Sequence, residues 1–205
     1  MPLHILDHPL AGHFLAHLRD RTTKPVTFRA LAHQLSLLLA IEATRDLPTL
    51  EKPIETPMEN TTGRVLAQPL VVVPILRAGL GMVQPFVDLF PDVSVGYIGL
   101  ERDHETARAR SYYHKLPPMA GARTLIVDPM LATGGSASQA IDLVIQAGAI
   151  APRLICIVAS PEGVEAVRAT HPDTHVYVAA VDRALDARKY ILPGLGDFGD
   201  RLYGT

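Results

Sequence analysis

The sequence predicts an α/β fold with a mostly parallel central sheet flanked by helices. Short runs of apolar, often β-branched residues are typical of buried strands, and the clearest are 71–76, 124–127 and 154–158. Helical patterns follow two of these runs, at 137–148 and 160–167. Strands that alternate with helices favour a parallel sheet with helices on both faces. The length of 205 residues fits a single domain over residues 1–205.

The composition excludes several classes of protein. With 48% hydrophobic and 20% charged residues, the chain has an ordinary globular make-up. A net charge of −2 gives no general attraction to nucleic acid or acidic membranes. No apolar run is long enough to span a membrane, and His4, Asp7 and His8 interrupt any signal-peptide pattern. We therefore expect a cytoplasmic protein, whose lone Cys156 serves core packing.

The N-terminal part predicts an extended piece at 2–6 and a short helix at 8–19. His13 and His17 lie one helical turn apart, which is a spacing that metal ligands use. No third ligand accompanies them in the sequence, so we interpret them as partly exposed helix residues. The next helix has apolar positions from 28 to 41, with Thr27 as its possible cap.

This second helix carries more apolar surface than one stripe needs, which suggests burial against a second chain as well as its own sheet. The proline-bearing stretch 49–69 then predicts extended strands or a loop, with a hairpin as one option. A third strand is expected at 93–100, followed by a dense polar segment at 101–117. Tyr112 and Tyr113 should point to opposite faces of a strand, one packed and one exposed.

A small-residue turn with a cation follows the strand at 71–76. Arg77 offers a planar fork of donors that suits a diphosphate, although a surface salt bridge is the alternative interpretation. Loops after strand ends hold ligands in open parallel sheets. This position therefore favours a binding role for Arg77.

The chain is organised around the loop that follows the strand at 124–127. Its residues Thr133–Ser136 lead into a helix, and a helix N-terminus presents unpaired N–H groups that bind phosphate. Asp128 at the strand end suits hydroxyl groups or a metal ion. A ribose phosphate satisfies both features, whereas a strand–turn–helix with glycines for tight packing is the plain alternative.

Three separated strings carry a resemblance to a known family. Asp128–Ser136 resembles the phosphoribosyl-diphosphate loop of type I phosphoribosyltransferases, and of their uracil branch in particular. Pro74–Gly81 is similar to the diphosphate loop of that branch, and Tyr190–Asp197 resembles its uracil-binding segment. The resemblance implies a type I phosphoribosyltransferase-like fold with an N-terminal helical arm, a flexible hairpin and a C-terminal base-binding segment.

The resemblance also implies site residues. Catalytic roles fall on Arg77, Arg102, Asp128 and Asp197. Phosphoribosyl diphosphate would contact these four together with Pro129, Met130, Leu131, Ala132, Thr133, Gly134, Gly135 and Ser136. Uracil would contact Ile191, Gly196, Asp197 and Phe198. Mg²⁺ would be held mainly by the ligand and waters, with no metal ligands assigned to the protein.

The implied reaction joins uracil to 5-phospho-α-D-ribose 1-diphosphate, giving UMP and diphosphate in pyrimidine salvage. A bent backbone rich in glycine, with four glycines between 194 and 204, can match the two carbonyls and the N–H of uracil. Family members imply a homodimer or higher homo-oligomer and a possible GTP activator, without nucleic-acid or membrane partners. A pyrimidine regulator that binds RNA, and an enzyme for purines or orotate, are the rivals.

Three departures from the family pattern stand out. Glu101 occupies a position where an aromatic residue is expected, and 107–110 replaces a more apolar stretch of the 101–111 hairpin. Phe198 stands where a small residue is usual. Its ring would either cover the base as a lid or narrow the pocket.

Overall fold

The computed structural model of the protein describes residues 1–102 and 109–205, and the side chains of 101, 102 and 109–111 fall outside that description. The strands of the central sheet are β1 (Leu3–Ile5), β4 (Leu70–Leu76), β6 (Tyr97–Arg102), β7 (Ala109–Lys115), β8 (Arg123–Val127), β10 (Arg153–Ala159) and β11 (His175–Val181). Their order is β1-β11-β10-β8-β4-β6-β7. Along this order every pair in the described part is parallel except β6 with β7. The predicted α/β class is confirmed.

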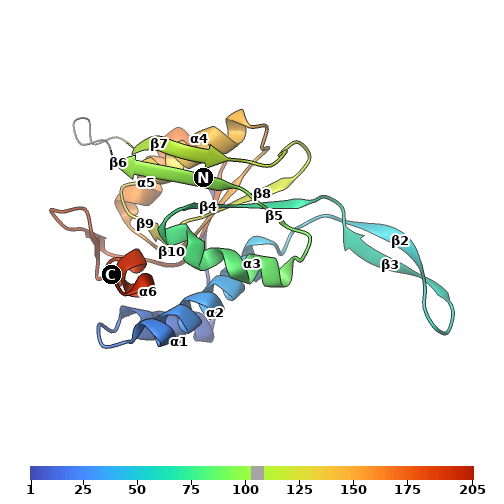
Figure 1. Ribbon diagram of the computed structural model, residues 1–205, viewed down its shortest axis with the longest axis horizontal. Helices are drawn as coiled ribbons and strands as arrows, with labels where there is room; N and C mark the ends of the chain where they lie inside the picture. The colour runs from blue at the N-terminus through green and yellow to red at the C-terminus, as the bar shows by residue number, and fades with distance from the viewer. Residues whose placement is uncertain (103–108) are drawn as a thin grey trace.

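Helices cover both faces of this sheet (Figure 1). One face carries α1 (Pro9–Arg19), α2 (Pro25–Ala43), α3 (Val83–Leu89) and the C-terminal α6 (Phe198–Tyr203). The other face carries α4 (Gly135–Gln146) and α5 (Pro161–Thr170). Each face encloses its own apolar core, because the strands of the sheet's centre are buried on both sides.

The starts of the helices follow local chemistry, with one correction. The Ser160 hydroxyl caps α5 by accepting a hydrogen bond from the Gly163 N–H at 2.9 Å, as the sequence predicts. The expectation that Thr27 caps the second helix is wrong, because α2 begins at Pro25 with Lys24 as its N-cap. Proline has no N–H to satisfy and its fixed φ suits the first helical position.

The wide apolar surface of α2 finds partners within the chain. Phe28, Leu35 and Leu39 are fully buried, and α2 packs against α1, α3, α6 and the strands β10 and β11. Among its large apolar side chains, Val26 and Ile41 stay more than half exposed. The breadth of the apolar face therefore reflects several contacts inside one protomer and does not require a second chain.

The stretch 49–69 forms the hairpin β2 (Thr49–Glu55) and β3 (Asn60–Leu66), which extends away from the body of the molecule (Figure 1). The hairpin option is thus confirmed. Exposed apolar side chains lie along it and at its tip, namely Leu50, Ile54, Met58, Val65 and Leu66.

The expected alternation of Tyr112 and Tyr113 is wrong, since both are about half exposed. A register shift opposite Gly99 and Leu100 places Tyr112 as an extra residue in β7. Such a bulge breaks the two-residue period on which the expectation depended.

Within the described residues, none of the helices has the combination of length and apolar character that crossing a membrane would take.

Candidate functional site

Two predicted ligand loops meet at the carboxyl ends of neighbouring strands. β4 and β8 pair in parallel with Pro74 opposite Val127, so the residues after each strand lie at one edge of the sheet. The loop after β4 also packs against the end of β8 itself, because a Cβ at Gly79 would lie 2.5 Å from the Val127 carbonyl oxygen. Only glycine allows this approach. Arg77 and Asp128 therefore follow the ends of two neighbouring strands, at the same edge of the sheet.

Hydrogen bonds from the start of α5 hold the loop 128–136 in place. The Ser160 hydroxyl donates to the Ala132 carbonyl at 2.6 Å, and the Ser160 N–H donates to the Leu131 carbonyl at 2.9 Å. Gly134 has φ +80° at the N-cap of α4, and a Cβ there would lie 2.7 Å from the Ala166 side chain. The first N–H groups of α4 have no partner within their own helix, and groups of this kind can bind an anion.

Within that loop, Thr133 and Ser136 are partly exposed and Gly135 is exposed. A Cβ at Gly135 would meet only the Thr133 hydroxyl, at 3.9 Å. The turn therefore opens toward space that a phosphate can occupy. The phosphate cradle predicted at Thr133–Ser136 lies at this turn.

Asp128 directly follows β8, and its carboxyl has a raised pKa. Burial raises the pKa of this carboxyl to about 7, and the hydrogen bond that it accepts from the Met130 N–H at 3.4 Å lowers the pKa by less. Among the described side chains, no cation pairs with it. A carboxyl of this kind accepts hydrogen bonds from hydroxyl groups and favours a positive charge placed beside it.

Arg77 is exposed at the start of the turn that follows β4, after a cis peptide bond to Leu76. It makes no ion pair with any described residue. The alternative interpretation, an arginine in a surface salt bridge, has therefore no partner in that part of the chain. Arg102 is the last residue of β6, and its predicted contacts lie outside the described side chains.

The C-terminal segment folds over the same edge of the sheet. Asp197 is the N-cap of α6 and accepts a hydrogen bond from the Asp200 N–H at 3.0 Å, while Gly196 before it has φ +80°. Of the two alternatives for Phe198, the lid is wrong, because its ring is 1% exposed and packs against the ring of Phe28, with centroids 5.2 Å apart. Core burial therefore explains the phenyl group.

A pocket of about 240 Å³ joins these parts. Its lining comes from the loop after β4 (Ala78), from the loop after β8 (Met130 and Ala132), and from the C-terminal segment. The C-terminal lining residues are Lys189, Tyr190, Ile191, Gly196, Asp197, Phe198 and Gly199. The structure thus brings Ile191, Gly196, Asp197 and Phe198 together, as predicted.

Sequence reasoning did not single out Lys189, Tyr190 or Ala78 as site residues. Lys189 has φ +70°, in the left-handed region that few non-glycine residues adopt. Tyr190 is the first residue of the string that resembles the uracil-binding segment, and it is half exposed. Ala78 and Tyr190 lie within recognised strings and Lys189 directly precedes one, which was the available signal.

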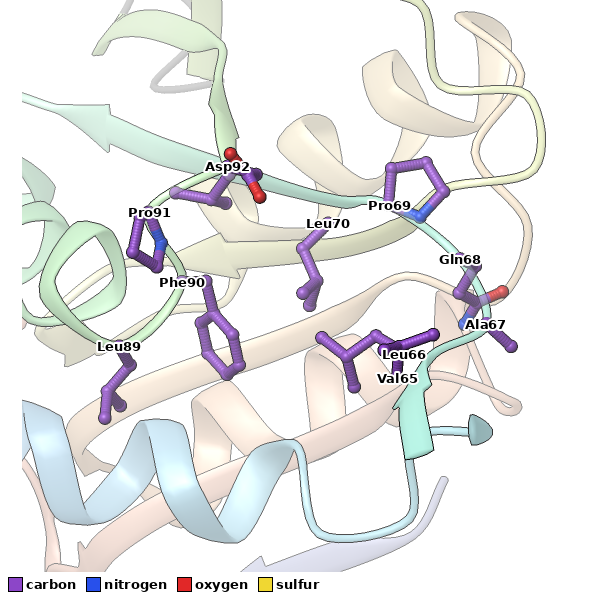
Figure 2. A pocket seen from close by; sticks show the side chains of 11 residues that line it. Val65, Leu66, Ala67, Gln68, Pro69, Leu70, Leu89, Phe90, Pro91 and Asp92 are labelled. Atoms are coloured by element: carbon purple, nitrogen blue, oxygen red, sulfur yellow. The ribbon is translucent and has the colours of Figure 1, made fainter. Parts of the chain in front are cut away.

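A larger cavity, of about 570 Å³, lies elsewhere. It sits at the amino end of β4, between the base of the β2–β3 hairpin and the end of α3 (Figure 2). Leu66, Leu70 and Phe90 contribute an apolar lining, with Asp92 at the side. It gathers none of the predicted ligand-binding residues, so size does not identify the site here.

Comparison with known proteins identifies the family. A family model described as uracil phosphoribosyltransferase matches residues 5–205. The chain belongs to the uracil phosphoribosyltransferase family. The resemblance predicted from three strings is therefore confirmed, and it extends over nearly the whole chain.

Relatives in the uracil phosphoribosyltransferase family cover the chain from end to end. Proteins of that name from Symbiobacterium thermophilum and Thermus thermophilus are each 50% identical. The match to the first protein covers 98% of this chain and 97% of that protein, and the match to the second covers 100% of both chains.

Solved structures share the fold of this chain. The AQ2163 protein of Aquifex aeolicus has a TM-score of 0.94 at 34% identity, over 99% of this chain and 98% of that one. A hypoxanthine phosphoribosyltransferase from Trypanosoma cruzi matches at TM-score 0.53 and 14% identity, over 77% and 76% of the two chains. The second likeness concerns the fold alone.

Proposed function

We propose that this protein transfers the phosphoribosyl group of 5-phospho-α-D-ribose 1-diphosphate to uracil, forming UMP and releasing diphosphate in pyrimidine salvage. One observation carries the proposal: the 240 Å³ pocket joins the end of β4, the loop after β8 and the C-terminal segment. A substrate pair made of a leaving diphosphate, a ribose phosphate and a base needs a binding segment for each of these three parts. The names of the full-length relatives support the same activity.

The phosphate and ribose would be held by the loop 128–136. The N–H groups at Thr133–Ser136 would bind the 5-phosphate, with Pro129–Ala132 forming the turn beneath the sugar. Asp128 would accept hydrogen bonds from the ribose hydroxyls. As the C1–oxygen bond to diphosphate breaks, the sugar gains oxocarbenium character, and an ionised Asp128 would favour that charge.

The leaving diphosphate would be stabilised by Arg77 and Arg102. Mg²⁺ bound to the diphosphate would neutralise part of its charge. Within the described residues, no three His, Cys, Asp or Glu side chains are grouped to hold a metal ion. As the resemblance implies, the ion would be held mainly by substrate oxygens and waters, with Asp128 as a carboxylate in the same site.

Uracil would lie against Ile191, Gly196, Asp197 and the backbone of Phe198. The segment can offer N–H, C=O and N–H groups to the two carbonyls and the N–H of the base. Cytosine inverts one donor and one acceptor, which leaves a buried polar group unpaired at about 1–3 kcal/mol each. Asp197 would sit between base and sugar, either orienting N1 of the base or bridging to the ribose.

A panel of bases tests this function. Uracil, 5-fluorouracil, cytosine, orotate and hypoxanthine are each mixed with phosphoribosyl diphosphate and Mg²⁺, and diphosphate release is followed. We expect release with uracil and its 5-fluoro analogue only. Release with orotate or hypoxanthine instead would assign another base. No release with any base, while phosphoribosyl diphosphate still binds, would favour a regulator and make RNA binding the next measurement.

We further propose that the protein works as a homodimer or higher homo-oligomer in the cytoplasm. The projecting hairpin supports this, because a two-stranded hairpin with exposed Leu50, Ile54 and Val65 is marginally stable alone. Sedimentation would show a monomer if the proposal is wrong. Activation by GTP stays a prediction from the resemblance, and an unchanged rate with added GTP would contradict it.

A further inference from the structure

Gly194 is the turning point of the base-binding segment. It has φ +58°, and a Cβ there would lie 2.2 Å from the Ile191 carbonyl oxygen, so the turn is closed tightly on itself. Both backbone polar groups of this buried residue bond to side chains. Its N–H donates to Asp182 Oδ2 at 2.9 Å, and its carbonyl accepts from Arg19 Nη1 at 2.7 Å. The turn therefore takes its position from Asp182, 12 residues away, and from Arg19, 175 residues away.

Arg19 and Asp182 also bind each other through a fork. Nη1 donates to Oδ2 at 2.8 Å and Nη2 to Oδ1 at 2.5 Å. The Asp182 side chain is 4% exposed and that of Arg19 is 24% exposed. Arg19 is the last residue of α1, and Asp182 follows β11, where its N–H donates to the Ala159 carbonyl at 2.7 Å. The pair thus connects α1 to the sheet edge through the base segment.

A second arginine holds the next residue of the segment. Arg201 of α6 donates to the Leu195 carbonyl at 2.8 Å and also bonds the Leu18 and Asp20 carbonyls, the latter at 2.5 Å. Its guanidinium lies 4.5 Å from the centroid of the Phe28 ring. Two consecutive carbonyls of the base segment are therefore tied to the C-terminal end of α1.

We propose that Arg19 and Asp182 are positioning residues for the nucleobase, which couple the end of α1 to base affinity through Gly194. The inference rests on the proposed transfer to uracil. Recognition of a base by backbone groups requires those groups to be placed within about 0.5 Å. Gly194 lies between Ile191 and Gly196, which both line the pocket. Neither arginine bonds to loop 128–136, so the effect falls on uracil and spares phosphoribosyl diphosphate.

Arg19→Lys tests the coupling. Lysine keeps the charge but lacks the planar fork that serves Asp182 and Gly194 together. We expect the KM for uracil to rise about tenfold, because one or two hydrogen bonds that position the backbone are lost. The dissociation constant for phosphoribosyl diphosphate should stay unchanged. Arg201→Lys, which loosens Leu195, should give the same split and serves if Arg19→Lys does not fold. The matched control is Arg168→Lys, which alters an exposed arginine–carboxylate pair with Glu165.

The outcomes separate the inference from the function on which it rests. A wild-type protein that uses uracil, beside an Arg19→Lys variant with an unchanged KM for uracil, would overturn the inference alone. Equal losses in the binding of both substrates would also overturn it, because they indicate general loosening. A wild-type protein inactive with uracil would overturn the proposed function and the inference with it.

Discussion

The two ends of the candidate site are held in different ways. The phosphate end, residues 128–136, is built locally: a strand, a turn and a helix in sequence, fixed by Ser160 about 30 residues later. The base end, residues 190–199, is held by Arg19, which lies 175 residues before the carbonyl that it binds. A site of the first kind is specified by its own sequence string. A site of the second kind depends on parts of the chain that carry no sign of a ligand.

The largest expected effect comes from disturbing the contact between α5 and the loop at the phosphate end. In Gly163→Ala, the new Cβ would lie 2.4 Å from the Ala132 carbonyl oxygen and 2.7 Å from that of Leu131, so the loop must move. A displacement of about 1 Å lowers catalytic efficiency about 100-fold. We expect that loss in kcat/KM for phosphoribosyl diphosphate, with the preference for uracil over cytosine retained.

The matched control for this variant is Gly12→Ala in α1. A Cβ at Gly12 meets nothing within 4 Å, and alanine stabilises a helix interior by about 0.5–1 kcal/mol relative to glycine. This variant should keep full activity and gain a few degrees in Tm. If Gly163→Ala bound phosphoribosyl diphosphate as the wild type does, the contact with α5 would not set the loop.

The difference between the two ends explains what the sequence predicts well. The alternation of apolar runs and helical patterns is local, so the parallel sheet, the helix N-terminus at 134–136 and the cap at Ser160 were predictable. The arrangement of Arg19, Asp182 and Gly194 was not, because the side-chain bonds span 12 to 175 residues. No periodicity records such a pairing.

Local rules also fail where another element decides. Thr27 has the chemistry of a cap, but Pro25 starts α2 earlier. Phe198 stands where a small residue is usual, which suggested a lid or a narrowed pocket, whereas its ring packs in the core against Phe28. Packing partners that sequence alone does not show determined where this side chain points.

A smaller effect is expected at Asp197, where the base end combines capping and chemistry. Asparagine caps a helix as well as aspartate does, so Asp197→Asn should retain the bond to the Asp200 N–H and the Tm. It loses a charged acceptor, whose hydrogen bonds are worth about 1.5–3 kcal/mol, so we expect kcat/KM for uracil to fall at least about tenfold. Asp197→Ala should lose the same activity and also about 1 kcal/mol of stability.

These two variants sharpen the comparison, because they separate the scaffold at the base end from its chemistry. Steady-state kinetics with both substrates and thermal unfolding provide the readouts. An Asp197→Asn variant as active as the wild type would leave Asp197 with a capping role only.

The last expected effect concerns stability and not activity, and it contrasts two carboxyls at strand ends. Asp182 at the base end is paired with Arg19, whereas Asp128 at the phosphate end has no cation partner among the described side chains. Burial raises the pKa of Asp128 from 3.8 to about 7, so folding favours its neutral form. The stability that this gives is complete below pH 4 and is lost as the pH rises through 7.

Asp128→Asn stays neutral at every pH, so its free energy of unfolding should gain on the wild type between pH 5 and pH 8. The full shift corresponds to at most about 4 kcal/mol, and the partial exposure of Asp128 reduces it. Thermal unfolding of both proteins at the two pH values measures the gain, with the exposed Asp173→Asn as control. Parallel curves for Asp128→Asn and wild type would mean that Asp128 is not held in an unfavourable charge state. The phosphate end would then lack the stability cost that distinguishes it from the base end, where Arg19 compensates the buried charge of Asp182.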